Sequence, residues 1–374
     1  MDTVCPRVTH LIPQIGIGGA EMQLCRLVSL APKQRAIQDV LYYSDSLDQD
    51  GFRVYRDAGI NFDRVERGKI GPHSFLRRLA GEIGRRKPDI LHCWLASGAL
   101  WGRWGGILAG VPRIVLSFRS TRVDLATLLR ISRWADGRRV HYLVNSNAVA
   151  AAVATRIGVR RPRITIIPNG IDLDRPQTAF SREALLREHG CPPGTRIALT
   201  VGRLTDAKNY PMLLRIAARC RGRLPVHFFV AGHGEREGEL RALAARLGLE
   251  DVVHFLGLRH DVQALLRAAD VFCYTSRYEG FPNALLESMA AECPIITTRF
   301  IGHEDLIEAG RTALAVAQDD DAGAFDALTL LINDAEMARA LAAAARRAAE
   351  TRFSLARMVE ATLGYYEGLM KGAV

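Results

Sequence analysis

Short apolar segments alternate with amphipathic ones along the first 170 residues of the chain. Helices of roughly 10 to 15 residues between short apolar strands are typical of a parallel sheet that is covered on both faces. Ligands of such sheets bind beyond the carboxyl ends of the strands. The strands predicted here are Arg7–Ile12, Asp39–Tyr43, Asn61–Val65, Pro88–His92, Arg113–Phe118, Val140–Asn145 and Ile164–Ile167.

The same pattern resumes in the second half of the chain. With 374 residues, the chain is too long for one ordinary core, so two α/β domains are predicted. The turn residues Asn169-Gly170 close the first domain, at residues 1–170. Strands of the second domain are predicted at Ile197–Val201, Val226–Val230, Val252–Leu256, Val271–Thr275 and Pro294–Thr297.

The most informative segment runs from Val271 to Glu287. A buried strand is followed by a glycine-containing turn and then by a helix that begins near Asn283, with Pro282 at a position that favours helix initiation. A helix that starts at the carboxyl edge of a parallel sheet attracts phosphate through its unpaired N–H groups. Glu279 in the turn and Glu287 in the helix are acids that either belong to a site or pair with an arginine.

Two cations follow the strand that ends at Val201. Arg203 and Lys208 lie five residues apart, just before a predicted helix over Tyr210–Cys220. Arginine supplies a planar fork of donors and lysine a point charge, and each hydrogen bond to a charged group contributes about 1.5–3 kcal/mol. This arrangement predicts a clamp for a diphosphate.

The first domain opens with a strand and the glycine-rich loop Gly16–Glu21. The dinucleotide motif Gly-x-Gly-x-x-Gly fails at its third position, which is Glu21, and the chain has no Gly-Lys-Ser/Thr phosphate loop. Two interpretations of this loop remain. Either its backbone approaches a phosphate or sugar closely, or the loop is a plain tight turn. His92 and Arg119 follow later strands, where each is either a ligand contact or a structural residue.

The string Glu279-Gly-Phe-Pro-Asn-x-x-x-Glu287 resembles the Glu-x7-Glu motif of retaining glycosyltransferases of family 4, which have the GT-B fold. The resemblance implies two Rossmann-like domains that face a central cleft. It implies an acceptor-binding domain at 1–170 and a nucleotide-sugar-binding domain at 171–352. The remaining residues, 353–374, would form a helix that returns to the first domain.

The resemblance also implies roles for individual residues. Glu279 would contact the donor sugar, Glu287 the ribose, and Arg203 and Lys208 the phosphates. The further donor-binding residues that it implies are Gly18, Gly19, Gly232, Gly234, Arg259, Gly280, Phe281, Pro282 and Asn283. His92 matches a family position near the acceptor. Arg119 stands where many members carry a histidine, and a permanently charged arginine there suits an anionic group.

The implied reaction is a retaining, metal-independent transfer of a sugar from a nucleoside-diphosphate sugar to a glycan or lipid-linked acceptor, with UDP favoured over GDP. No cofactor is expected. One alternative is a nucleotide-sugar epimerase of the same fold. Another is a phosphorylase, although no lysine stands out as a site for pyridoxal phosphate. A catalytically silent scaffold protein is the third.

Positive charge is concentrated in one region. The chain has a net charge of +10, and the stretch from Arg77 to Arg163 holds 17 basic against 4 acidic residues. Such an excess predicts an anionic partner, and an anionic membrane or glycolipid fits better than nucleic acid because no recognition motif accompanies the charge. A merely solvated arginine-rich surface is the alternative. The segment Arg122–Val140 either lies on a membrane as a basic amphipathic helix or packs its apolar residues on the sheet.

The N-terminus lacks the pattern of a signal peptide, and no apolar run reaches the roughly 18 to 20 residues that span a bilayer. The seven cysteines are scattered without a Cys-x-x-Cys pair, so neither zinc nor a disulfide framework is expected. A cytoplasmic protein, peripheral on the inner face of the membrane, is predicted.

Overall fold

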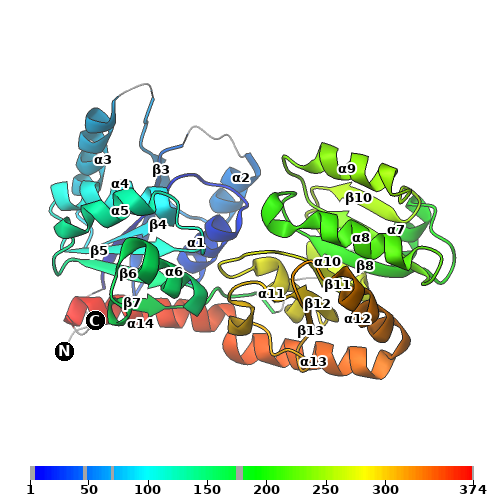
Figure 1. Cartoon of the computed structure of the whole chain (residues 1–374). Coiled ribbons are helices and arrows are strands. Elements are labelled where there is room, and N and C mark those ends of the chain that lie inside the picture. Colours follow the sequence, from blue (N-terminus) through cyan, green and yellow to red (C-terminus); the bar gives the residue numbers. More distant parts are fainter. Residues whose placement is uncertain (1–4, 45–48, 69–70, 174–179, 373–374) are drawn as a thin grey trace. The chain divides into compact units, whose positions relative to one another are not determined.

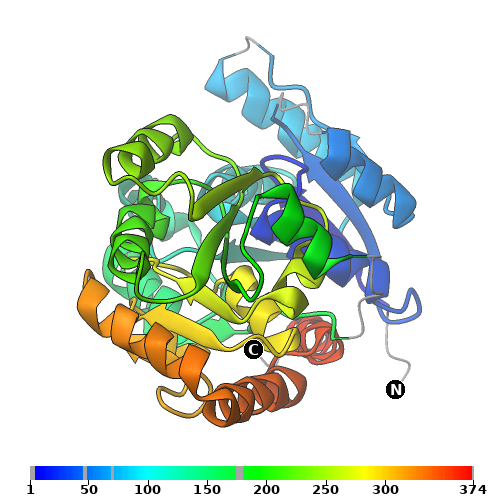
Figure 2. The same cartoon turned by 90° about the vertical axis from the view of Figure 1, so that its right-hand side faces the viewer.

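The computed structural model describes residues 5–44, 49–68, 71–173 and 180–372. The chain divides into two compact units. Unit 1 contains the chain up to Gly170 together with the segment from Leu355 onward, and unit 2 runs from Ile171 to Ser354. Each unit is described below by itself (Figures 1 and 2).

Unit 1 contains a parallel sheet in the order β3-β2-β1-β4-β5-β6-β7, as far as the described residues define it. Its strands are apolar because both faces of a parallel sheet are covered. Their bounds are β1 Arg7–Ile12, β2 Ile37–Tyr42, β3 Phe62–Arg64, β4 Ile90–Trp94, β5 Arg113–Phe118, β6 Val140–Val144 and β7 Ile164–Ile166.

Helices cover both faces of this sheet (Figure 1). One core cluster joins it to α3 (Pro72–Arg86), α4 (Leu95–Leu108), α5 (Ala126–Ile131) and α6 (Asn147–Ile157). The other joins it to α1 (Gly19–Leu30), α2 (Gln49–Asp57) and α14 (Leu355–Lys371). The last helix of the described chain, α14, therefore packs against the sheet of unit 1.

Unit 2 holds a second parallel sheet in the order β10-β9-β8-β11-β12-β13, again within the described residues. The strands are β8 Arg196–Val201, β9 Val226–Ala231, β10 Val253–Gly257, β11 Val271–Tyr274, β12 Ile295–Thr298 and β13 Leu314–Val316. The helices are α7 Arg182–Glu188, α8 Tyr210–Cys220, α9 Glu237–Arg246, α10 Val262–Ala268, α11 Asn283–Ala290, α12 Asp321–Asn333 and α13 Ala335–Arg352.

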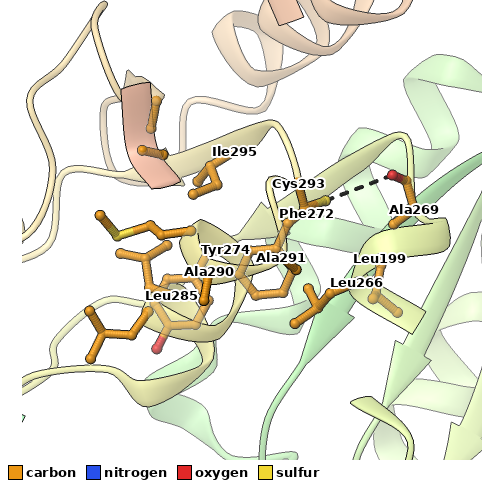
Figure 3. Packing of buried hydrophobic residues seen from close by; sticks show 14 of the residues in the cluster. Leu199, Leu266, Ala269, Phe272, Tyr274, Leu285, Ala290, Ala291, Cys293 and Ile295 are labelled. Atoms are coloured by element: carbon orange, nitrogen blue, oxygen red, sulfur yellow. Dashed lines mark hydrogen bonds between the residues drawn. The ribbon is translucent and has the colours of Figure 1, made fainter. Parts of the chain in front are cut away.

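Two core clusters sandwich the sheet of unit 2. Helices α8, α9 and α12 supply one, and α7, α10 and α11 supply the other, while α13 contributes to both. Figure 3 shows part of the second cluster, which includes Leu266 of α10, Phe272 of β11 and Leu285 of α11. In the same view the Cys293 thiol donates to the carbonyl oxygen of Ala269 at 3.9 Å.

Both sheets reverse their strand order beside their first strand. The switch points lie between β1 and β4 in unit 1 and between β8 and β11 in unit 2. In doubly wound sheets, the crevice outside the carboxyl ends of the strands at such a point is where ligands bind. The loops after β1, β4, β8 and β11 are therefore the places to look for a site.

The fold agrees with the two predicted parallel sheets and differs from the prediction in detail. Within the Arg122–Val140 segment, one interpretation of which is a single amphipathic helix, the structure has the short helix α5 followed by a 3₁₀ turn over Ser132–Ala135. Pro282 is the N-cap of α11 instead of its first helical residue. Helices α7, α9 and α10 and strand β13 were not predicted.

The chain passes between the units twice, at adjacent points. Ile171 and Ser354 form a parallel bridge in unit 2. In unit 1 a Cβ added to Gly170 would lie 2.9 Å from the Cα of Leu355. Among the described residues, no helix combines the length and apolar character needed to cross a bilayer.

Candidate functional site

Three side chains meet at the switch point of unit 2. The ammonium group of Lys208 lies 2.6 Å from Glu279 Oε1 and donates to the Tyr274 hydroxyl at 2.7 Å. That hydroxyl donates to the same carboxylate oxygen at 2.7 Å. Burial, and then the nearby Glu279 carboxylate, raise the pKa of Tyr274 well above its ordinary value, so the phenol keeps its proton. Lys208, Tyr274 and Glu279 form what we call the Lys208 cluster.

The loop that carries Lys208 is fixed from several sides. Lys208 ends a 3₁₀ turn, and Asn209 then adopts a left-handed conformation (φ 50°) that starts α8. The buried Asn209 amide donates to Asp319 at 3.1 Å. The Thr275 hydroxyl donates to the Lys208 carbonyl at 2.9 Å, and the Arg277 N–H donates to the Ala207 carbonyl at 2.8 Å. The loops after β8 and β11 therefore hold each other.

Arg203 lies at the start of the same loop. Its side chain is exposed and, within the described residues, has neither an ion pair nor a hydrogen bond. Its guanidinium group is therefore available to an anionic ligand. The structure thus places both predicted cations in one loop, with Lys208 engaged by Glu279 and Arg203 directed to solvent.

The predicted glycines Gly232 and Gly234 support this loop from behind. A Cβ on Gly232 would lie 1.9 Å from the Gly202 carbonyl oxygen, and one on Gly234 would lie 2.4 Å from the Leu204 carbonyl oxygen. The Leu204 N–H also donates to the His233 carbonyl at 3.1 Å. Only glycine allows the two backbones to come this close.

The other predicted donor-binding residues that follow β11 differ from one another in burial and contacts. Gly280 is buried, Phe281 packs edge-on against Phe353 at 5.4 Å within the core, and Pro282 caps α11. Asn283 begins the helix, so Glu287 lies one turn along the same face, where its side chain is partly exposed. Phe281 thus has a structural role whatever it contributes to a ligand.

Arg259 follows β10 at the same sheet edge. Its guanidinium group binds the Asp261 carboxylate through two hydrogen bonds of 2.8 and 2.6 Å. This pair raises the pKa of Arg259 and lowers that of Asp261. A ligand that uses the Arg259 side chain must share it with Asp261.

In unit 1, Gly18 and Gly19 stand at the beginning of α1. Gly18 is the N-cap of the helix, and a Cβ there would lie 2.5 Å from Glu21 Oε2. The buried Glu21 carboxylate therefore folds back toward the helix N-terminus, where Gln14 donates to it at 3.2 Å. The Glu21 side chain therefore lies against the loop of Gly18 and Gly19, a contact that the failed dinucleotide motif does not predict.

His92 and Arg119 are brought together at the switch point of unit 1 by the Trp94 indole. His92 stacks on Trp94 at 4.7 Å, and the Arg119 guanidinium lies over the indole at 4.4 Å. His92 Nδ1 is 2.7 Å from the Tyr366 hydroxyl of α14. Burial, with His10 and Arg119 nearby, holds the pKa of His92 well below its ordinary value, so its ring is neutral.

Arg119 keeps its charge in this setting. Burial lowers the pKa of Arg119 to about 10, which still leaves the group protonated at neutral pH. It donates to Asn169 at 2.7 Å. The arrangement offers a fixed cation and a neutral imidazole at the end of two strands.

Sequence reasoning missed three residues that position the site. Tyr274, Asn209 and Asp319 hold Lys208 and its loop in place. Tyr274 was predictable only as a strand residue. Asp319 lies far along the chain from the loop that it anchors, so no local pattern points to it.

Comparisons with known proteins identify the family to which the chain is similar. Residues 17–175 match the family described as Glycosyltransferase Family 4, and residues 181–348 match Glycosyl transferases group 1. The chain is 30% identical to D-inositol 3-phosphate glycosyltransferase of Pseudarthrobacter chlorophenolicus over 75% of this chain and 72% of that protein.

Two further likenesses concern nucleotide sugars. The chain is 27% identical to the Escherichia coli UDP-Gal:alpha-D-GlcNAc-diphosphoundecaprenol alpha-1,3-galactosyltransferase over 67% of this chain and 68% of that protein. The fold is similar to that of Anabaena Alr3699/HepE in complex with UDP and glucose, with a TM-score of 0.85, 20% identity and coverage of 96% of this chain and 99% of that one.

Proposed function

The chain belongs to glycosyltransferase family 4 and has the GT-B fold, and we propose that it transfers a sugar with retention from a UDP-sugar to a lipid-linked or glycan acceptor. The observation that carries this proposal is the Lys208 cluster beside Arg203 at the switch point of unit 2. Polysaccharide or glycolipid synthesis is the setting that the relatives indicate.

The donor would bind at the carboxyl edge of unit 2. Arg203 and Lys208 neutralise the diphosphate, and the N-terminus of α11 adds the partial positive charge of its backbone N–H groups. Glu279 then orients the sugar hydroxyls and Glu287 the ribose. UDP is the preferred nucleotide because one similar structure contains UDP and a curated relative is named for UDP-Gal.

In the proposed reaction, the bond between the sugar C1 and the β-phosphate oxygen breaks while the acceptor hydroxyl attacks the same face. The hydroxyl proton passes to the departing phosphate oxygen. Lys208 and Arg203 stabilise the negative charge that develops on the diphosphate, which is the work a metal does in other transferases. The reaction would need no divalent metal.

Unit 1 would bind the acceptor through the partly exposed Arg119, with the buried His92 behind it as a positioning residue. A lipid-linked acceptor carries a diphosphate, as in the name of the E. coli relative, and the charged Arg119 fits such a group. His92 and Trp94 are buried at 0% and 1% exposure, so they would act by holding Arg119 in position.

The same unit carries a surface that suits an anionic membrane. Leu128, Ile131 and Trp134 are 50%, 64% and 80% exposed, whereas Leu129 of the same segment is buried in the core. Basic residues of the Arg77–Arg163 stretch accompany them. We call Leu128, Ile131 and Trp134 the apolar ridge. Its neighbouring charge points to peripheral binding on the inner, anionic leaflet.

The donor proposal is tested by thermal stabilisation in the presence of a chelator. UDP should raise the melting temperature of the protein without divalent metal, and Arg203→Ala should reduce that shift. Arg130→Ala, which removes an exposed arginine in unit 1, is the matched control. Dependence of the shift on added metal would contradict the metal-independent mechanism.

Acceptor dependence separates the transferase from the epimerase. A transferase converts the UDP-sugar much faster with a lipid-diphosphate acceptor than without one, and the product keeps the anomeric configuration of the donor. Release of UDP at the same rate without any acceptor would favour the epimerase. If the protein neither binds UDP nor turns over a UDP-sugar, the catalytically silent scaffold would be the supported alternative.

Membrane binding is tested with vesicles. The protein should sediment with vesicles that contain anionic lipid, and salt should weaken the binding. Serine at Leu128, Ile131 and Trp134 should abolish it, whereas Leu258→Ser, at an exposed leucine of unit 2, should not. No binding of the unmodified protein at low salt would reject the membrane proposal.

A further inference from the structure

A cysteine and two histidines converge at the other edge of the unit 2 sheet. His227 is the second residue of β9 and His254 the second residue of β10, so both lie at the amino ends of their strands. Cys191 lies in the connection between α7 and β8. The Lys208 cluster follows the carboxyl ends of β8 and β11, so this group is separate from the proposed donor site.

Strand register explains why the two imidazoles face each other. His254 pairs with Phe229, and Phe229 lies two residues after His227, so all three side chains are on one face of the sheet. Phe229 belongs to the core cluster that includes Leu185 of α7. The connection that follows α7 therefore brings Cys191 onto the same face.

The three potential ligand atoms form a compact triangle. His227 Nδ1 lies 3.0 Å from His254 Nε2, and Cys191 Sγ lies 3.3 Å from the first nitrogen and 3.7 Å from the second. Zinc bonds of about 2.0–2.1 Å to nitrogen and 2.3 Å to sulfur place tetrahedral ligand atoms about 3.3–3.6 Å apart. The triangle thus has nearly the dimensions of one face of a zinc tetrahedron.

Without a metal, one hydrogen bond joins the two imidazoles, whose ring centroids are 5.3 Å apart with an interplanar angle of 19°. Each ring nitrogen has a single outward direction for its proton or lone pair, so the Cys191 thiol cannot also be well aligned with both nitrogens. A cation centred above the triangle would instead accept a lone pair from each atom. His227, His254 and Cys191 are all at least partly buried, which limits competition from water.

We propose that Cys191, His227 and His254 bind one Zn²⁺ ion through a thiolate and two imidazoles, with water in the fourth position. This ligand set suits zinc because it combines a soft sulfur with borderline nitrogens. His189, whose ring lies 4.9 Å from that of His254, packs beside the site. No local sequence pattern points to this group, because Cys191 is 36 residues from His227 and 63 from His254.

Metal binding would affect the stability of unit 2. The ion would tie the α7–β8 connection to β9 and β10, three segments that are otherwise joined through backbone pairing and core packing. A cross-link of distant segments stabilises the fold, because the metal binds the folded state preferentially. The ion would act on the stability of unit 2 and would take no part in sugar transfer.

Cobalt is the direct probe, because tetrahedral Co²⁺ with a thiolate ligand absorbs light in a characteristic way. The full-length protein, stripped of metal by a chelator, should bind one equivalent of Co²⁺ with a thiolate charge-transfer band and intense visible bands. Zn²⁺ should displace the cobalt and remove both. Zn²⁺ but not Mg²⁺ should also raise the melting temperature of the stripped protein.

Variants assign the signal to the three residues. Cys191→Ser, a nearly isosteric change, should abolish the charge-transfer band, and His254→Asn should weaken metal affinity at least about tenfold. Cys5→Ser and His233→Asn remove a cysteine and an exposed histidine elsewhere and should leave both signals unchanged.

Absence of a thiolate band in the unmodified protein, or an equal band in Cys191→Ser, would overturn the zinc proposal. UDP binding is measured separately in the same preparations. Loss of UDP binding with intact cobalt spectra would count against the donor site alone. The two proposals therefore fail independently.

Discussion

Tyr274 illustrates how much of the candidate site depends on single residues. Its hydroxyl accepts a hydrogen bond from Lys208 and donates one to Glu279, so it fixes the separation of a cation and an anion that the donor would contact. The sequence predicted both charged partners from their positions after apolar strands. It could not predict Tyr274, because tyrosine is common in buried strands and the sequence does not show which groups its hydroxyl contacts.

The variant Tyr274→Phe tests this role. Lys208 and Glu279 still pair directly without the hydroxyl, so its loss should cost about 1.5–3 kcal/mol in total and lower kcat/KM for the donor roughly 10- to 100-fold. Steady-state kinetics with a UDP-sugar provides the measurement. Tyr365→Phe, which removes a buried hydroxyl in unit 1, should change kcat/KM little. Equal kinetics for the two variants would show that Tyr274 is structural.

His10 predicts a pH dependence of stability. Burial lowers the pKa of His10 to about 4, although a hydrogen bond with Gln38 opposes the shift. In the unfolded chain its pKa is about 6.5, so between pH 6.5 and 4 the unfolded state binds the extra proton and stability falls as pH falls. The shift corresponds to about 3 kcal/mol.

Urea unfolding at several pH values measures this effect. In His10→Gln the free energy of unfolding should depend less on pH between 6.5 and 4 than in the unmodified protein. His233→Gln, at an exposed histidine, should keep the original dependence. Parallel curves for the unmodified protein and His10→Gln would refute the assignment.

At the scale of elements, the loops of unit 2 depend on one another. The glycine loop after β9 packs against the backbone of the loop that carries Arg203 and Lys208. Gly232→Ala should therefore displace that loop, destabilise the protein by about 1–3 kcal/mol and weaken UDP binding.

Gly238 provides a matched control for this prediction. It is the second residue of α9, where a Cβ would meet no atom within 4 Å apart from the backbone of the helix itself. Gly238→Ala should thus stabilise the protein by about 0.5–1 kcal/mol through its helix propensity. Thermal unfolding measures the stability of both variants, and titration with UDP measures their affinity for the nucleotide. Unchanged UDP binding in Gly232→Ala would reject the coupling of the loops.

The segment that bears the apolar ridge is held by a buried arginine. Arg103 of α4 lies 2.9 Å from Asp136, donates to the Leu129 carbonyl at 2.8 Å, and also contacts the Ser132 hydroxyl. Removing one partner of a buried ion pair costs about 3–5 kcal/mol, so Arg103→Met should destabilise unit 1 by about that amount.

Protease cleavage between residues 125 and 135 should also become faster in Arg103→Met. Arg130→Met, which removes an exposed arginine of α5, is the control and should alter neither urea unfolding nor cleavage. A loss of less than about 1 kcal/mol in Arg103→Met would show that this cluster contributes little.

The sequence predicted the long elements well and the short or charged ones poorly. The buried parallel strands read as apolar runs, so their positions were predicted to within a few residues. Helix α9 was missed because, among its residues, only Leu240 and Ala244 are buried. Strand β13 has three partly buried residues, which is too short a run to recognise.

At the scale of the whole molecule, unit 1 is built from two separate parts of the chain. Helix α14 supplies Met358, Val359 and Leu363 to one core cluster and the Tyr366 hydroxyl to His92. Its return to unit 1 was predicted from family resemblance, because nothing in an amphipathic terminal helix says which unit it covers.

Truncation after Ser354 should therefore unfold unit 1 and spare unit 2. The lost apolar side chains each contribute about 1.5–3 kcal/mol, and several of them together match the stability of a typical domain. Limited proteolysis should leave a fragment of unit 2 that still binds UDP, since its core clusters contain no residue of α14. Truncation after Lys371 is the control, and degradation of both units alike would contradict the prediction.

The double crossing between the units also constrains how the protein is made. A ribosome completes the sheet of unit 1 well before it reaches α14, and the whole of unit 2, from Ile171 to Ser354, is translated in between. At typical elongation rates this interval lasts roughly 10 to 40 seconds. Throughout it, the apolar face that α14 will cover stays open on the nascent chain, so unit 2 can mature before the unit that precedes it.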